Sequence, residues 1–128
     1  MSSHTEILRS IFADWNAGSR SVPAATHPDA VLHSTLTGAD YTGHDGIRRW
    51  MAEVDEQFDF WELDADEYRD VGDHGVLVLG KVRLRGRSSG VELEQPLAWV
   101  FRFEDGMIVE SWFYPDHADG IATAEELG

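Results

Sequence analysis

The segment of residues 95–117 constrains the fold most, because it holds two strongly β-prone runs joined by a single turn signal. Valine, isoleucine and aromatic side chains dominate both runs, and these residue types pack well on a pleated sheet. Between the runs, Asp105 and Gly106 tolerate the positive φ angles of a tight reversal. The sequence therefore predicts a β-hairpin in this segment.

Alternation along the two strands gives the hairpin two faces, and both faces carry large apolar side chains. Because neither face can lie open to water, we expect helices on one face and a second copy of the chain on the other. The first face contains Leu97, Trp99, Phe101, Ser111 and Phe113, and the second contains Val100, Arg102, Ile108, Trp112 and Tyr114.

Composition sets the class of protein. With 128 residues, a hydrophobic fraction of 42% and no apolar run of membrane-spanning length, the chain is predicted to be a single soluble domain over residues 1–128. The absence of cysteine excludes disulfides and thiolate metal sites. A formal net charge of −14 repels nucleic acids and anionic lipids, so we expect neither nucleic acid nor membrane as a partner. We expect a cytoplasmic location.

Three segments before the strands are predicted to be helical. Residues 3–16 and 42–58 carry apolar side chains at helical spacing, and each segment opens on a capping-box pattern. Between them, residues 19–26 form the third, short segment, in which Pro23 is allowed in the first helical turn. Residues 118–128 are predicted to be a weakly helical or frayed tail.

Strands fill most of the remaining chain. A short strand is predicted at residues 30–34, and the acidic segment 60–70 is predicted to be an edge strand or to carry a bulge. Residues 75–85 and 91–103 form an antiparallel pair in which opposite charges meet across the strands. The facing residues are Arg83 and Arg85 on one strand and Glu92 and Glu94 on the other.

Several motifs, in this order of elements, carry a family resemblance: Asp29-Ala-Val-Leu-His33, Tyr41-Thr-Gly43-His-Asp-Gly46-Ile, Arg87-Ser-Ser-Gly90-Val-Glu, and Phe103-Glu-Asp-Gly106-Met-Ile-Val109 ending in Tyr114-Pro-Asp116. The chain resembles the SnoaL-like branch of the NTF2-like superfamily, which includes steroid delta-isomerases and polyketide cyclases. The resemblance implies an α+β cone, a strongly bent and mostly antiparallel sheet with three N-terminal helices on its concave face. It also implies a deep pocket in the cone and a dimer formed through the convex face.

The catalytic residues of the best-defined enzymes in that superfamily are absent from this sequence. Laid against the steroid-isomerase pattern, Trp99 stands in place of an oxyanion-binding acid, Ile11 in place of a tyrosine, and Ser34 in place of the carboxylate base. Phe113 stands where limonene epoxide hydrolases carry a catalytic aspartate. Because the fold serves many activities, the resemblance leaves the reaction, and whether there is one, open.

An aromatic wall with a few polar groups is typical of a site for small hydrophobic ligands. The alternative is that these aromatic side chains fill the cone and leave no cavity. The predicted pocket residues are Ile11, Trp15, Leu32, Tyr41, Trp50, Val82, Leu84, Leu97, Trp99, Phe101, Ser111 and Phe113.

Three residues are candidates for proton transfer: Ser34, His33 and Gln95. Imidazole titrates near neutral pH, but strand alternation turns His33 away from Ser34, so a hydrogen-bonded structural histidine is the alternative. The scattered histidines show no metal-ligand spacing, and the sequence contains no phosphate-binding or dinucleotide-binding fingerprint. We therefore expect no metal and no cofactor.

Two function hypotheses follow. In the first, the protein binds a small apolar molecule in the cone, with isomerase-, cyclase- or hydrolase-type chemistry unassigned, and dimerises through Val100, Arg102, Ile108, Trp112 and Tyr114. In the second, it is a non-catalytic accessory or protein-interaction domain that acts through that same convex face.

Overall fold

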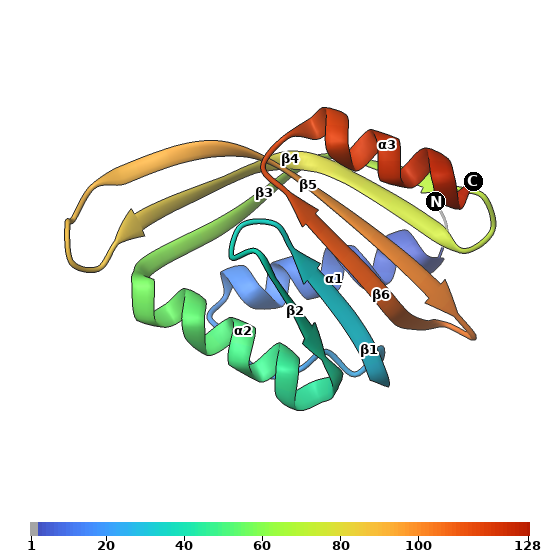
Figure 1. Cartoon of the computed structure of the whole chain (residues 1–128), viewed down its shortest axis with the longest axis horizontal. Helices are drawn as coiled ribbons and strands as arrows, with labels where there is room; N and C mark the ends of the chain where they lie inside the picture. Colours follow the sequence, from blue (N-terminus) through green and yellow to red (C-terminus); the bar gives the residue numbers. More distant parts are fainter. Residues whose placement is uncertain (1–2) are drawn as a thin grey trace.

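The computed structural model describes residues 3–128, which form three helices and six strands (Figure 1). The helices are α1 (Ser3–Asn16), α2 (Gly43–Gln57) and α3 (His117–Leu127). The strands are β1 (Thr26–Ser34), β2 (Ala39–Thr42), β3 (Phe58–Val71), β4 (Gly75–Gly86), β5 (Glu92–Glu104) and β6 (Met107–Tyr114).

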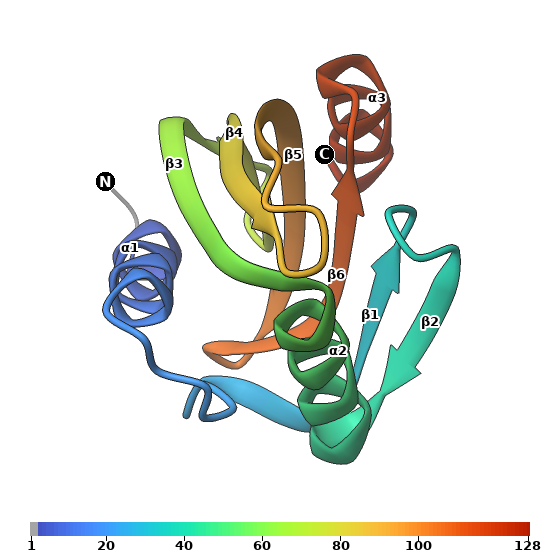
Figure 2. The same cartoon turned by 90° about the vertical axis from the view of Figure 1, so that its left-hand side faces the viewer.

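All six strands belong to one sheet in the order β2-β1-β6-β5-β4-β3. The β1–β6 pair is parallel and the other neighbouring pairs are antiparallel, so the sheet is mixed but mostly antiparallel as predicted. Figure 2 shows how strongly the sheet bends, with α1 beside β3 and α2 beside β1. The predicted α+β cone is confirmed.

The predicted hairpin is β5–β6, and its turn residues Asp105 and Gly106 have φ angles of 51° and 76°. The alternation of β5 is also as predicted. In β6 the register shifts, because Arg102 pairs with Glu110 whereas Phe103 pairs with Ile108. This bulge leaves an extra residue in β6 and turns Ile108 inward, where it is buried in the main core. The prediction that Ile108 lies on the convex face was therefore wrong.

Strand β3 is an edge strand, as its acidic sequence predicted. Register shifts between Phe58 and Phe60 and between Ala65 and Glu67 show that it also carries bulges. Its carboxylates pair with basic residues of β4 on the outer face, and Arg83 and Arg85 lie opposite Glu94 and Glu92 in β5 as expected. The ion pairs of β3 with β4 are Asp59–Arg85, Glu62–Arg83 and Asp64–Lys81.

The N-terminal half contains two helices instead of the expected three. Residues 19–25 carry no helix, because the chain crosses there from the end of α1 to β1. Helix α2 begins where the sequence predicted, but its N-cap residue, Thr42, makes no side-chain capping hydrogen bond. Gly43 follows it with a φ of 71°, a left-handed conformation that does not belong to a capping box.

The third helix is α3, at the C-terminal end of the described chain, and it covers the face of the sheet opposite to α1 and α2 (Figure 1). It buries an apolar layer formed by Leu77, Leu79, Ala98, Val100 and Ala124. Val100 is fully buried. The prediction that Val100 belongs to an exposed dimer face was therefore wrong, because α3 occupies that part of the face.

Within residues 3–128, no helix is long and apolar enough to cross a membrane.

Gly120 lets α3 approach the sheet closely, since a Cβ atom added there would overlap the Cβ of Ala98. We expect Gly120→Ala to lower the free energy of unfolding by about 1–2 kcal/mol, because overpacking outweighs the better helix propensity of alanine. Urea denaturation measures the change. Adding Ala98→Gly removes the overlap, so the double variant should lose less than the sum of the two single variants. Simple additivity would contradict this packing of α3.

Candidate functional site

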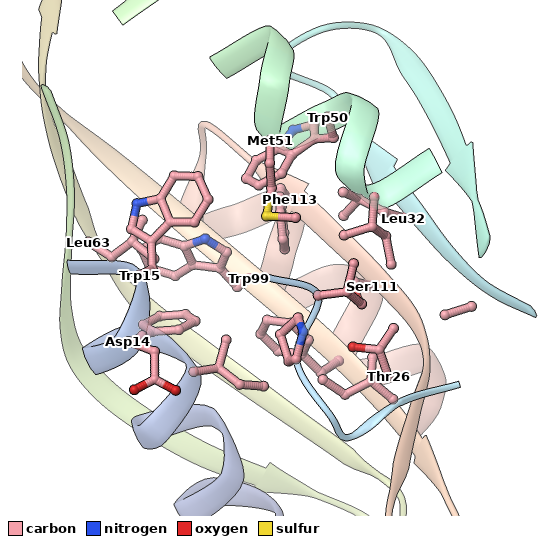
Figure 3. Close-up of a pocket in the computed structure, with 18 of the residues that line it drawn as sticks. Asp14, Trp15, Thr26, Leu32, Trp50, Met51, Leu63, Trp99, Ser111 and Phe113 are labelled. Atoms are coloured by element: carbon pink, nitrogen blue, oxygen red, sulfur yellow. The ribbon is translucent and has the colours of Figure 1, made fainter. Parts of the chain in front are cut away.

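A cavity of about 290 Å³ lies between the concave face of the sheet and helices α1 and α2 (Figure 3). We refer to it as the first cavity. Its wall combines α1, the 19–24 segment, α2 and the inner faces of the strands. Nine of the predicted pocket residues line it: Ile11, Trp15, Leu32, Trp50, Leu97, Trp99, Phe101, Ser111 and Phe113.

Contacts between aromatic rings hold this wall in place. Phe12 of α1 lies edge-on to Trp99, with 5.0 Å between ring centroids, and Trp50 of α2 lies edge-on to Phe113 at 5.4 Å. Trp15 links α1 to α2 through Trp50 at 5.6 Å. Such tilted and edge-to-face pairs are the favoured arrangement of aromatic rings, so the wall is ordered without any ligand.

Trp15 is fixed by two further contacts. Its indole Nε1 donates a hydrogen bond of 2.9 Å to the carbonyl oxygen of Trp61 in the edge strand β3. The Arg20 guanidinium lies over its ring, 3.6 Å from the ring centre, and pairs with Asp55 of α2. These contacts hold the end of α1 against β3 and α2 and thereby close one side of the first cavity.

Polar groups occupy two regions of the first cavity. Ser111 and Thr26 are buried in its interior, whereas Asp14, Ser19 and Ser21 are exposed where the cavity meets solvent. Thr26, Asp14 and the 19–24 segment were not predicted to be part of the wall. Residues 19–26 were predicted to be helical, whereas in the structure residues of this segment line the rim of the cavity.

Several predicted site residues lie away from the first cavity. Tyr41 and Val82 are packed in the core, since alternation identifies the face of a strand but not the depth of a side chain on it. Ser34 is 3% exposed, and its hydroxyl group makes no hydrogen bond within residues 3–128. The structure thus does not bring Ser34 to the cavity wall.

Gln95 and Leu84 line a second cavity, of about 180 Å³, on the other side of Trp50 and Trp61. Both indole side chains, together with Leu36, line the two cavities. The other residues around the second cavity are Thr37, Glu53, Val54, Gln57 and Phe58. Glu53 was not predicted to line a cavity, because an acidic residue on the polar side of an amphipathic helix is ordinarily exposed to solvent.

A hydrogen bond from Tyr41 fixes the carboxylate of Glu53. The Tyr41 hydroxyl donates a hydrogen bond of 2.5 Å to Glu53 Oε2 and lies 3.0 Å from Thr37 Oγ1. Burial, followed by the hydrogen bond to Glu53, raises the pKa of Tyr41 above its ordinary value. Tyr41 therefore stays a protonated donor, and Glu53 acts as the acceptor.

His33 lies on the outer face, between two carboxylates. Its Nδ1 is 2.8 Å from Asp40 Oδ1, its Nε2 is 2.7 Å from Glu110 Oε2, and its ring stacks on Trp112. Burial lowers the pKa of His33, but the hydrogen bonds and charges of Glu110 and Asp40 outweigh it and raise the pKa above the ordinary value. These contacts support the structural interpretation and place His33 outside both cavities.

The chemistry available to the first cavity is limited. Among its lining residues, which all belong to the described part of the chain, Asp14 has the one acidic or basic side chain, and it is exposed at the rim. Within residues 3–128, no three His, Asp or Glu side chains converge in a way that could hold a metal ion. The first cavity is therefore built to enclose apolar surface, with Ser111 and Thr26 as hydrogen-bonding groups.

The raised pKa of His33 makes stability depend on pH. A histidine whose pKa is higher in the folded state stabilises that state fully below its unfolded pKa of about 6.5, and loses the effect as pH rises through the folded value. We therefore expect the stability difference between wild type and His33→Gln to be larger near about pH 5.5 than near about pH 8.5. Denaturant titrations at both pH values measure it. His74→Gln, at an exposed histidine, is the control, and equal differences at the two pH values would contradict the ion pairs.

Comparison with known proteins places this geometry in a family. Residues 8–111 match the SnoaL-like domain. No protein with a curated description matches the sequence. An NTF2-like protein of unknown function from Burkholderia pseudomallei is similar in structure, with a TM-score of 0.82, 24% identity, and coverage of 95% of this chain and 97% of that one.

Two further solved structures show the same architecture. An NTF2-like protein from Burkholderia thailandensis has a TM-score of 0.80 at 22% identity, covering 97% of this chain and 98% of that one. TerC, co-crystallised with polyporic acid, has a TM-score of 0.80 at 19% identity, covering 97% and 99% of the two chains. At these identities the likeness shows the fold alone. With the family match across most of its length, the chain belongs to the SnoaL-like domain family.

Proposed function

We propose that this protein binds a small, largely apolar molecule in the first cavity. The observation that carries this proposal is a cavity of about 290 Å³, open to solvent at one rim, whose wall is mostly aliphatic and aromatic. Cavities in protein cores that serve only packing are few and seldom larger than a water molecule. A space of this size, left open among seven aromatic side chains, is typical of a ligand site.

The shape of the wall favours a compact, flat ligand. Trp99, Phe101 and Phe113 present ring surfaces from the sheet, and Trp15 and Trp50 present theirs from the helices. Ser111 and Thr26 can each exchange one hydrogen bond with a polar atom of the ligand. The volume is near the lower limit of about 300 Å³ for ligand pockets, which favours a molecule of two fused or linked rings. TerC, which shares the fold, was crystallised with polyporic acid, and this supports a small organic molecule as the ligand.

Binding is better supported than catalysis in the first cavity. Isomerase, cyclase or hydrolase chemistry needs a group that moves a proton within hydrogen-bond reach of the substrate. Within residues 3–128 no carboxylate or imidazole is hydrogen-bonded to the hydroxyl group of Ser111 or Thr26. The nearby His44 bonds instead to the backbone carbonyl oxygen of Thr26, at 3.0 Å, and Asp14 lies at the rim. We therefore propose a carrier or sensor of an apolar molecule, in place of an acid–base enzyme acting in this cavity.

Filling the first cavity should abolish binding. In wild type, 2-naphthol at 100 times its Kd should add about 2.7 kcal/mol of stability, which raises Tm by roughly 10 °C. Ser111→Leu places a larger side chain in the cavity, so the shift should disappear while the fold, followed by circular dichroism, is retained. Ser88→Leu makes the same change at an exposed turn and should keep the shift. A flat response of wild type across a panel of bicyclic aromatic compounds would refute the proposal.

We also propose a homodimer through the part of the outer face that α3 leaves uncovered. Arg102 and Trp112 lie there beside His33, whereas Tyr114 is tied to α3 by a hydrogen bond of 2.7 Å to Thr123. Arg102 lies next to the carboxylates of Glu104 and Glu110, at 3.2 and 3.3 Å. This strip carries positive and negative side chains on either side of an aromatic ring. The same strip of a second copy, related by a two-fold axis, can therefore contact it with opposite charges facing each other.

Light scattering tests the dimer. Wild type should have twice the mass of one chain, and Trp112→Glu should have the mass of one, because the new charge would be buried at the two-fold axis. Tyr114→Phe, which removes only the hydroxyl group bound to α3, should remain dimeric. A wild type with the mass of one chain would exclude the dimer.

A further inference from the structure

We propose that the second cavity is a binding site for a small organic cation, such as a protonated alkyl- or arylamine. The cation would lie against the Glu53 carboxylate and the aromatic side chains of Trp50, Phe58 and Trp61. This site is a different cavity from the first, although Leu36, Trp50 and Trp61 line both. Four features of the described residues support it.

The first feature is a carboxylate held in place. Glu53 Oε2 accepts the short hydrogen bond from Tyr41, whose side chain is 1% exposed and cannot turn away. The second carboxylate oxygen, Oε1, has Arg49 Nε at 3.9 Å. Arg49 is 60% exposed, so this ion pair is weak and a ligand can compete with it. Glu53 therefore offers one oriented oxygen to the cavity.

The second feature is the group of aromatic side chains around that carboxylate. Phe58 and Trp61 have ring centroids 4.9 Å apart and planes inclined at 56°, and Trp50 lines the same cavity. The negative face of an aromatic ring attracts an ammonium group, most strongly for tryptophan. A carboxylate beside several rings thus favours a cation that carries apolar groups over a hydrated metal ion.

The third feature is the lack of any positive charge in the lining. The residues around the second cavity, all in the described part of the chain, include no arginine, lysine or histidine. Thr37, Gln57 and Gln95 add neutral oxygen atoms that can accept hydrogen bonds from an amine. An anionic ligand would meet the Glu53 carboxylate inside the cavity, whereas Arg49, the counter-charge of Glu53, lies outside the lining. The net charge of −14 would also repel an anion.

The fourth feature is the position of the cavity at the C-terminal end of α2. Glu53, Val54 and Gln57 lie in its last turns and Phe58 is its C-cap. The carbonyl end of a helix is negative and favours cations. Arg87, which does not line the cavity, donates hydrogen bonds to the carbonyl oxygens of Asp55 and Phe58, so a cationic side chain already binds at this end of the helix.

The cavity can be reached from solvent without opening the core. The Glu53 side chain is 37% exposed, and Gln57 is exposed beside it. An amine can therefore enter with its charge toward Glu53, while its apolar part contacts Leu84, Phe58 and the two indoles.

Isothermal titration calorimetry at neutral pH with three related probes tests this site. The probes are 2-phenylethylamine, which is protonated, 2-phenylethanol, which is neutral, and 3-phenylpropionate, which is negative. Wild type should bind the amine most tightly and the carboxylate least. Glu53→Gln should weaken the affinity for the amine about tenfold or more, because it removes a charge-assisted hydrogen bond. The affinity for the alcohol should stay unchanged. Glutamine still accepts the hydrogen bond from Tyr41, so the variant keeps the local fold.

Three further variants make the outcome specific. Glu56→Gln removes the same charge from an exposed position of α2 and should bind the amine like wild type. Phe58→Leu keeps an apolar side chain but removes a ring, so it should weaken the affinity for the amine more than the affinity for the alcohol. Ser111→Leu, which fills the first cavity, should not change amine binding. Equal binding of amine and alcohol by wild type, equal losses in Glu53→Gln and Glu56→Gln, or loss of amine binding in Ser111→Leu would each overturn the site.

Discussion

Apolar packing on both faces of one bent sheet is the constraint on which the rest of the structure depends. Strands β4 and β5 direct Val76, Val78 and Trp99 to the concave side, and Leu77 and Val100 to the other. Burial of each such side chain stabilises the folded state by about 1.5–3 kcal/mol, so neither side can remain in water. Helix α3 covers one side closely, through small residues. Helices α1 and α2 cover the other side at the distance set by large rings, and that distance leaves room for cavities.

The sequence predicted those parts of the fold that rest on repeated patterns. Period-two alternation identified the faces of β5, and apolar spacing identified α1 and α2. It could not show the register shift that turns Ile108 inward, because a bulge depends on pairing between strands and leaves no mark in one strand. The sequence also predicted only a weakly helical or frayed tail where the structure has the regular helix α3. The inner side of that helix is formed by Gly120 and Ala124, which give almost no apolar signal but allow close contact with Ala98.

The candidate site was predictable to a similar degree. Alternation selected the strand side chains Leu32, Leu97, Trp99, Phe101, Ser111 and Phe113 of the first cavity, because strands present every second residue to the same side. The rim at Asp14 and Ser19 was missed, since loop positions follow no period. Glu53 was missed for a different reason: on a helix it looks like an ordinary surface acid, and only the buried hydroxyl of Tyr41, twelve positions earlier, distinguishes it. Groups that act through a neighbour distant in the sequence require the structure.

The parallel pairing of β1 with β6 also bears on how the chain folds. Strands β3 to β6 follow one another as antiparallel neighbours, so their contacts are local and close only short loops. By contrast, the β1–β6 contacts join Leu32 to Ser111 and Ser34 to Phe113, which requires most of the chain to be in place first. The four-stranded meander can therefore assemble early. The half of the wall formed by β1, β2 and α2 then docks late, and the hollow interior comes into existence only at that final step.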